Sequence, residues 1–101
     1  MNKRKLEDLL DNLQIKANLL GYKYWITAVE IYLKDNAIRI TELYKQVAEK
    51  HNTTASRTER ALRHAHESKE EIVQDYFNVN YSIDNSAFLA LLTREMEREE
   101  C

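Results

Sequence analysis

The sequence has no proline, a single glycine at position 21 and a single cysteine at position 101. Tight turns between β-strands depend largely on glycine, so little turn chemistry is available for a sheet. The usual phosphate-cradling loops of nucleotide-binding enzymes are rich in glycine, and one glycine cannot build them. A lone cysteine can form no disulfide within the chain, which fits a reducing compartment. These absences favour an all-helical protein.

The chain also lacks a long uncharged hydrophobic run. Its start, MNKRK, is basic, but Glu7, Asp8 and Asp11 add acidic charges soon after it, so no signal peptide or membrane span is visible. We therefore expect a cytoplasmic protein with no membrane partner. The formal net charge of −2 excludes a general polyanion-binding surface, so an electrostatic partner has to be bound by a local patch.

With 101 residues, 44% of them hydrophobic, the chain can bury one core but not two. We expect a single domain over residues 1–101, folded as a compact all-α bundle of about five to six helices that contains a helix-turn-helix. Leucines spaced by three and four predict a first helix over residues 3–20, which Gly21 would end in a positive-φ conformation. The next helix, from Tyr22 to Leu33, is apolar nearly all round and should lie at the centre of the core.

Two further helices are expected next, separated by the polar residues 51–54. Thr41 is the expected cap of the first, which carries Leu43, Tyr44, Val47 and Ala48 inward. The second spans about residues 54–68 and forms, with the first, the helix-turn-helix candidate. Its inward side is predicted to hold Thr58, Ala61, Leu62 and Ala65, and its outward side Arg57, Arg60, Arg63 and His64.

The remaining pattern is helical as far as Phe77, with a boundary near Asn78 and an irregular connection after it. Asp84 or Ser86 is expected to cap the last helix. That helix carries an inward face made of Phe88, Leu91, Leu92 and Met96.

The arginines of residues 54–68 predict the function. The planar guanidinium of Arg60 or Arg63 matches the N7 and O6 acceptors of guanine in the major groove, and Glu59 can accept a hydrogen bond from a cytosine amine. Thr54 and Ser56 can offer hydroxyls to a phosphate at the helix start. An ordinary solvated face remains open as an alternative, in which Ser56 and Glu59 form a capping box.

Other kinds of site find little support. His64 and His66 are two apart on a predicted helix and point in different directions, unlike a metal-binding pair at i and i+4. No nucleophile, base and orienting acid are grouped in the sequence, so we expect no enzyme, no cofactor and no small-molecule substrate. Tyr22, Tyr24 and Trp25 occur on the most apolar helix, where they should pack inside rather than stack on RNA bases.

The segment from Asn52 to Ala65 closely resembles the DNA-reading segment of the stage zero sporulation protein A family, through the string Asn-Thr-Thr-Ala-Ser-Arg-x-Glu-Arg-Ala-x-Arg-His-Ala. The resemblance covers nearly the whole chain in the family's order. Its other elements are Gly21-Tyr22-x-Tyr24 with Ala28, Val47-Ala48-x-Lys50-x-Asn52, and Asn85-Ser86-x-Phe88.

The resemblance implies a six-helix effector domain whose recognition helix enters the major groove of double-stranded DNA, commonly as a tandem pair on repeated short sites. Carried over by position, Glu59, Arg60 and Arg63 face bases. Four further residues seat the helix on the DNA backbone: Thr54, Ser56, Arg57 and His64. We therefore expect a DNA-binding transcriptional regulator, with a homodimer on tandem sites.

Two departures from the family pattern bear on control. The family protein carries an amino-terminal receiver domain, whereas this sequence starts at the effector domain, so we expect no receiver domain. The segment from Glu67 to Asn85 is shorter than the family's and contains Glu67, Glu70 and Glu71. These departures leave an alternative function open: an interaction module that pairs with a full-length sporulation regulator and modulates it.

Overall fold

The computed structural model describes residues 2–98, and these form six α-helices without a β-strand. This confirms the predicted all-α class. In chain order the helices are α1 (Lys3–Asn12), α2 (Leu20–Lys34), α3 (Ile40–Lys50), α4 (Ala55–Glu67), α5 (Glu70–Phe77) and α6 (Asn85–Arg98).

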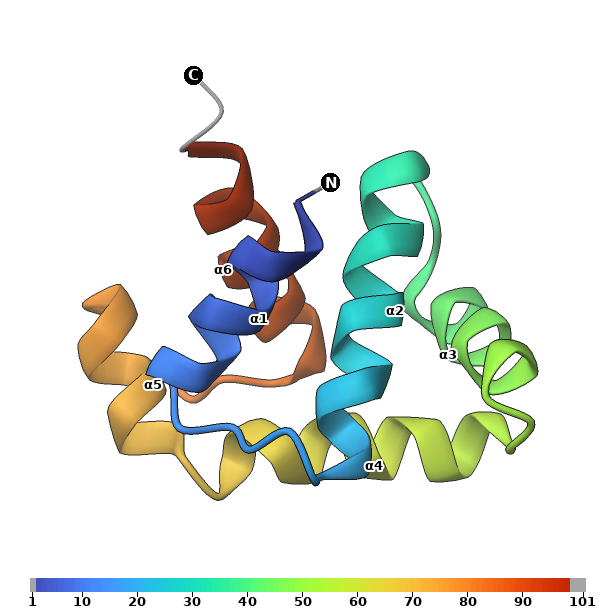
Figure 1. Cartoon of the computed structure of the whole chain (residues 1–101), viewed down its shortest axis with the longest axis horizontal. Helices are drawn as coiled ribbons and strands as arrows, with labels where there is room; N and C mark the ends of the chain where they lie inside the picture. The colour runs from blue at the N-terminus through green and yellow to red at the C-terminus, as the bar shows by residue number, and fades with distance from the viewer. Residues whose placement is uncertain (1, 99–101) are drawn as a thin grey trace.

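α2 forms the centre of the bundle, as its apolar sequence predicted. It stands across α4, which lies along one edge of the molecule, while α3 packs on one side and α1 and α6 on the other (Figure 1). Trp25 is fully buried, and its ring meets Phe88 of α6 edge-on at a centroid distance of 4.9 Å. Its indole Nε1 donates a hydrogen bond of 2.9 Å to the carbonyl oxygen of Leu62 in α4. One aromatic side chain thus joins three helices.

The first helix is shorter than predicted. It ends at Asn12, and Gln14 has a φ of 62°, a left-handed conformation that stops the helix. Ile15 is then fully buried and anchors the connection to α2. The leucine spacing continues past the break, but Leu20 already belongs to α2 and 60% of it is exposed.

The expected role of Gly21 was wrong. It ends no helix and has no positive φ; it is the second residue of α2 and is buried. A Cβ atom built on it would lie 2.5 Å from the carbonyl oxygen of Ala61 and 2.6 Å from the Cβ of Ala65. The glycine therefore allows α2 to approach the backbone of α4 closely.

The starts of α3 and α6 differ in how they are capped. Thr41 does not cap α3, because the helix begins at Ile40 after Arg39 and has no side-chain cap. Asp84, rather than Ser86, caps α6: its Oδ1 accepts a hydrogen bond of 2.8 Å from the amide of Ala87.

The boundary near Asn78 is confirmed. Asn78 follows the last residue of α5 and has a left-handed conformation with a φ of 55°. Asparagine is among the few residues other than glycine that adopt this conformation readily, which explains a helix end in a chain so poor in glycine.

Candidate nucleic-acid interface

α3 and α4 form the predicted helix-turn-helix. α3 ends at Lys50, and the turn after it holds Asn52 at a φ of 52°. The amide of Thr53 donates a hydrogen bond of 2.9 Å back to the carbonyl oxygen of Ala48, which closes the turn. The angle between the two helices is therefore fixed by backbone bonds within a few residues.

Thr54 caps α4. Its Oγ1 accepts a hydrogen bond of 3.1 Å from the amide of Arg57, which satisfies one of the free amides of the first helical turn. The alternative capping box of Ser56 and Glu59 is wrong, since Ser56 lies inside the first turn rather than before it. The hydroxyl proton of Thr54 is not used by this bond and remains able to donate.

The inward face of α4 is close to the prediction. Thr58, Leu62 and Ala65 are buried, and Ala61 is partly buried against the start of α2. His66 is also buried, and the predicted inward face did not include it. A histidine is compatible with either side of a helix, so its residue type gave no decisive signal.

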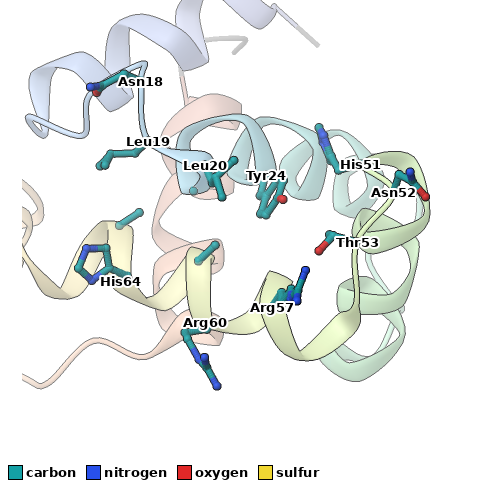
Figure 2. A pocket seen from close by; sticks show the side chains of 13 residues that line it. Asn18, Leu19, Leu20, Tyr24, His51, Asn52, Thr53, Arg57, Arg60 and His64 are labelled. Carbon is teal, nitrogen blue, oxygen red and sulfur yellow. The ribbon is translucent and has the colours of Figure 1, made fainter.

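All seven predicted DNA-contacting residues lie on α4 or at its cap. Six are exposed, and Glu59 is partly buried. In Figure 2 the side chain of Arg60 points away from α2, whereas Arg57 and His64 lie on the side that α2 faces. With 3.6 residues per helical turn, Glu59 and Arg63 lie on the flank of α4 that is turned away from Arg57 and His64, and Arg60 lies between the two flanks.

Arg63 and Glu59 form an ion pair on that flank, with Nε of Arg63 3.5 Å from Oε1 of Glu59. Both side chains keep solvent contact, at 46% and 35% exposure. An exposed i,i+4 pair contributes only about 0.3–0.5 kcal/mol, so a partner can separate it at little cost. Within residues 2–98, no hydrogen bond or ion pair holds the guanidinium of Arg60.

A groove of about 700 Å³ runs beside α4, between that helix and the start of α2 (Figure 2). Arg57, Arg60 and His64 line it from α4, and Asn18 and Leu20 line it from the other side. We call it the α2–α4 groove. No local sequence pattern predicts it, because its two sides are about forty residues apart in the chain.

His51 also lines the α2–α4 groove. Its Nε2 lies 2.7 Å from the hydroxyl of Thr27, and its ring packs against Tyr24 with a centroid distance of 4.8 Å. Burial lowers the pKa of His51, and the charges of Lys23 and Lys50 lower it further. The imidazole is therefore mainly neutral at pH 7 in the free protein.

A buried polar network connects α4 to α3 and α6. Oδ1 of Asn85, the first residue of α6, lies 2.7 Å from Nε2 of His66. Nδ2 of Asn85 donates to the hydroxyl of Tyr44 at 3.0 Å and to the carbonyl oxygen of Glu59 at 3.3 Å. One amide thus binds α4 at two points and α3 at a third.

The two titratable residues of this network, His66 and Tyr44, both have shifted pKa values. Burial lowers the pKa of His66, outweighing the hydrogen bond to Asn85 and the nearby carboxylates, which raise it. Burial also raises the pKa of Tyr44. Neutral His66 therefore donates its Nε2 proton to Asn85. His66 and Asn85 were both visible in the sequence, but nothing there paired them.

The described residues offer neither a metal site nor a membrane span. Within residues 2–98, no group of three histidine, cysteine, aspartate or glutamate side chains is placed to hold a metal ion. No helix in this range has the length and apolar character that crossing a membrane requires. Cys101, on which the expectation of a reducing compartment partly rested, lies outside the described residues.

Comparison with known families gives a match over most of the chain. Residues 6–96 match the family model described as the C-terminal domain of the sporulation initiation factor Spo0A. The matched range includes all six helices in whole or in part and every predicted contact residue. The resemblance found in the sequence is confirmed. Domains of this family are the DNA-binding effector part of a sporulation response regulator.

Proposed function

The chain belongs to the family of Spo0A C-terminal domains, and on this premise we propose that it is a sequence-specific, double-stranded-DNA-binding transcriptional regulator. In this proposal α4 enters the major groove. Glu59, Arg60 and Arg63 read base edges, and four residues contact the DNA backbone: Thr54, Ser56, Arg57 and His64.

The observation that carries the proposal is the placement of Arg60. Its side chain is exposed, points away from the bundle and is held by no carboxylate among residues 2–98 (Figure 2). A free guanidinium on the outer face of the second helix of a helix-turn-helix can reach N7 and O6 of guanine with two parallel hydrogen bonds. Binding DNA then breaks no ion pair of Arg60.

The pair of Glu59 and Arg63 supports base reading on the next flank. Their mutual contact holds both side chains on one side of α4 before DNA arrives. In the complex, Arg63 would donate to a guanine and Glu59 would accept from a cytosine amine. A carboxylate facing DNA is repelled by phosphates unless it finds such a donor, so Glu59 favours sequence reading over charge attraction alone.

The cap of α4 supports the position of the helix on the backbone. Thr54 uses an oxygen lone pair for the amide of Arg57 and keeps its proton for a phosphate oxygen. Ser56, exposed in the first turn, offers a second hydroxyl. Such contacts set the register of the helix without reading sequence.

In the same proposal the protein acts in the cytoplasm, has no catalytic role, and binds tandem sites as a homodimer. With a net charge of −2 the protein has to bind DNA through a local patch, which this proposal centres on α4.

Selection from a random duplex library at two salt concentrations tests the function. The protein should enrich a short motif containing guanines, and Arg60→Ala should lose the preference at one position. Failure to enrich any motif would refute the proposal. If the same protein co-purified with a full-length sporulation regulator, the alternative interaction module would take its place.

A further inference from the structure

We propose that the α2–α4 groove holds the sugar–phosphate backbone of one DNA strand while α4 lies in the major groove. Asn18 and Leu20, which lie outside the helix-turn-helix, would then contact DNA. The inference rests on the function proposed above and adds a second contact element to the same complex.

An α-helix and the major groove of DNA have similar widths, so a DNA strand should lie directly beside the α4 wall of the α2–α4 groove. An α-helix with its side chains is about 10–12 Å wide, and the major groove of B-DNA is about 12 Å wide. A helix in that groove therefore has a DNA backbone directly against each of its two flanks. One flank of α4 carries Glu59 and Arg63, and the other is the wall of the α2–α4 groove.

The charge of the groove suits a polyanion. Arg57 and His64 line it seven residues apart on α4, which is about 10 Å along the helix axis, so they can face different phosphates. Among the groove-lining residues there is no aspartate or glutamate. A DNA strand passing along this wall meets cationic and polar groups without a repelling carboxylate.

The opposite wall combines a polar group with an apolar one. The amide of Asn18 is exposed and can donate to a phosphate oxygen. Leu20 is 60% exposed, the largest exposed fraction of a large hydrophobic residue within residues 2–98, and it lines the groove together with Tyr24. Carbon atoms of deoxyribose rings suit such a surface, so the wall matches alternating sugar and phosphate groups.

The sharpest test is a substitution that should increase the affinity for DNA, since a misfolded variant cannot bind DNA more tightly. Leu20→Lys places an ammonium on the far wall, where it should meet a phosphate. The variant should bind the selected duplex at least threefold more tightly at 0.1 M salt. The slope of log K against log salt should also become steeper by about 0.9.

The matched control is Ala37→Lys. Ala37 is exposed in the loop after the C-terminal end of α2, the end away from α4 (Figure 1), and the substitution changes net charge equally. It should leave the salt slope unchanged. Leu20→Glu places a negative charge at the same position. It should lower the affinity about tenfold or more for selected and scrambled duplexes alike.

The outcomes separate the two proposals. If the wild-type protein binds its selected duplex and Leu20→Lys behaves like Ala37→Lys, the groove does not hold DNA, and the function of α4 stands. If the wild-type protein prefers no duplex, both proposals are overturned. A steeper salt slope for Leu20→Lys alone supports the groove as a backbone contact.

Discussion

At the scale of single residues, Gly21 determines how closely α2 and α4 pack, because its side chain is a single hydrogen atom. The carbonyl oxygen of Ala61 and the Cβ of Ala65 occupy the space that a Cβ at position 21 would need. Alanine is the better helix former by about 1 kcal/mol, but the collision involves backbone that cannot move without shifting α4.

Gly21→Ala should therefore lower the free energy of unfolding by about 1–3 kcal/mol, as overpacking does. Urea denaturation followed by circular dichroism measures this. Leu20→Ala, at the exposed neighbouring position, should change stability far less and serves as control. An increase in stability of Gly21→Ala would show that α2 and α4 are not in close contact.

Arg57 and Arg60 lie three positions apart on α4, but replacing each of them with alanine should change DNA binding in different ways. Arg57→Ala removes a proposed backbone contact, so affinity should fall evenly across sequences and the salt slope should become shallower by about 1. Fluorescence anisotropy with selected and scrambled duplexes at several salt concentrations measures both. Loss of base preference without a change of slope would assign Arg57 to the bases instead.

At the scale of elements, α4 is held at a fixed angle by Asn85 of α6. Its side-chain amide joins His66, Tyr44 and the carbonyl oxygen of Glu59, which lie on two other helices. Loss of the amide leaves buried polar groups without partners, and each such group costs about 1–3 kcal/mol.

We expect Asn85→Ala to destabilise the protein by at least about 1–3 kcal/mol. It should also reduce the ratio of specific to non-specific DNA affinity, because α4 loses its support. Urea denaturation and anisotropy measure the two effects. Ser86→Ala, at the exposed next position of α6, is the matched control. Equal stability of the two variants would mean that the network does not hold α4.

Elements were predictable where a cap and a helical period agreed. α4 has Thr54 before it and buried positions at three- and four-residue intervals, and Asp84 precedes a similar pattern in α6. The first helix was predicted too long because its leucine spacing continues beyond the break at Gln14. A glutamine does not by itself predict a left-handed backbone conformation, so the sequence gives no local sign that the helix ends here.

The candidate site was predictable to the extent that it lies on one helix. The outward placement of Arg57, Arg60, Arg63 and His64 follows from helical periodicity alone. The contacts of Asn85 join residues that are 19, 26 and 41 positions apart, and the α2–α4 groove likewise joins distant segments. Such pairings depend on the packing of the whole bundle, so no local pattern predicts them.

At the scale of the whole molecule, the lowered pKa values of two histidines connect stability to pH. Burial lowers the pKa of His66 below its ordinary 6.5, so the unfolded chain binds a proton more readily than the folded protein. The free energy of unfolding should therefore be highest above pH 6.5 and fall as the pH drops from there to the folded-state pKa.

Urea denaturation at about pH 7.5 and about pH 5.5, on either side of the ordinary histidine pKa, measures this loss. His66→Gln, which cannot titrate, should show a smaller difference between the two pH values. His51 contributes in the same direction, since its pKa is also lowered, and should account for part of the remaining dependence. An identical pH dependence in wild type and His66→Gln would contradict a buried, neutral His66.

The molecule as a whole is slightly acidic, yet it presents the arginines of α4 along one edge. α4 lies at that edge, while the start of the chain and the end of α6 lie at the opposite one (Figure 1). The exposed arginines Arg57, Arg60 and Arg63 therefore lie on a helix at the edge of the molecule, where a partner can approach them (Figure 1).

The central claim, that Arg60 reads a base, is tested most directly by a double-mutant cycle between protein and DNA. Affinities are measured for wild type and Arg60→Ala, each with the selected duplex and with one in which the guanine assigned to Arg60 is replaced. A bidentate contact predicts a coupling free energy of about 1–3 kcal/mol at that base pair and none at its neighbours. A coupling near zero at every position would contradict the account.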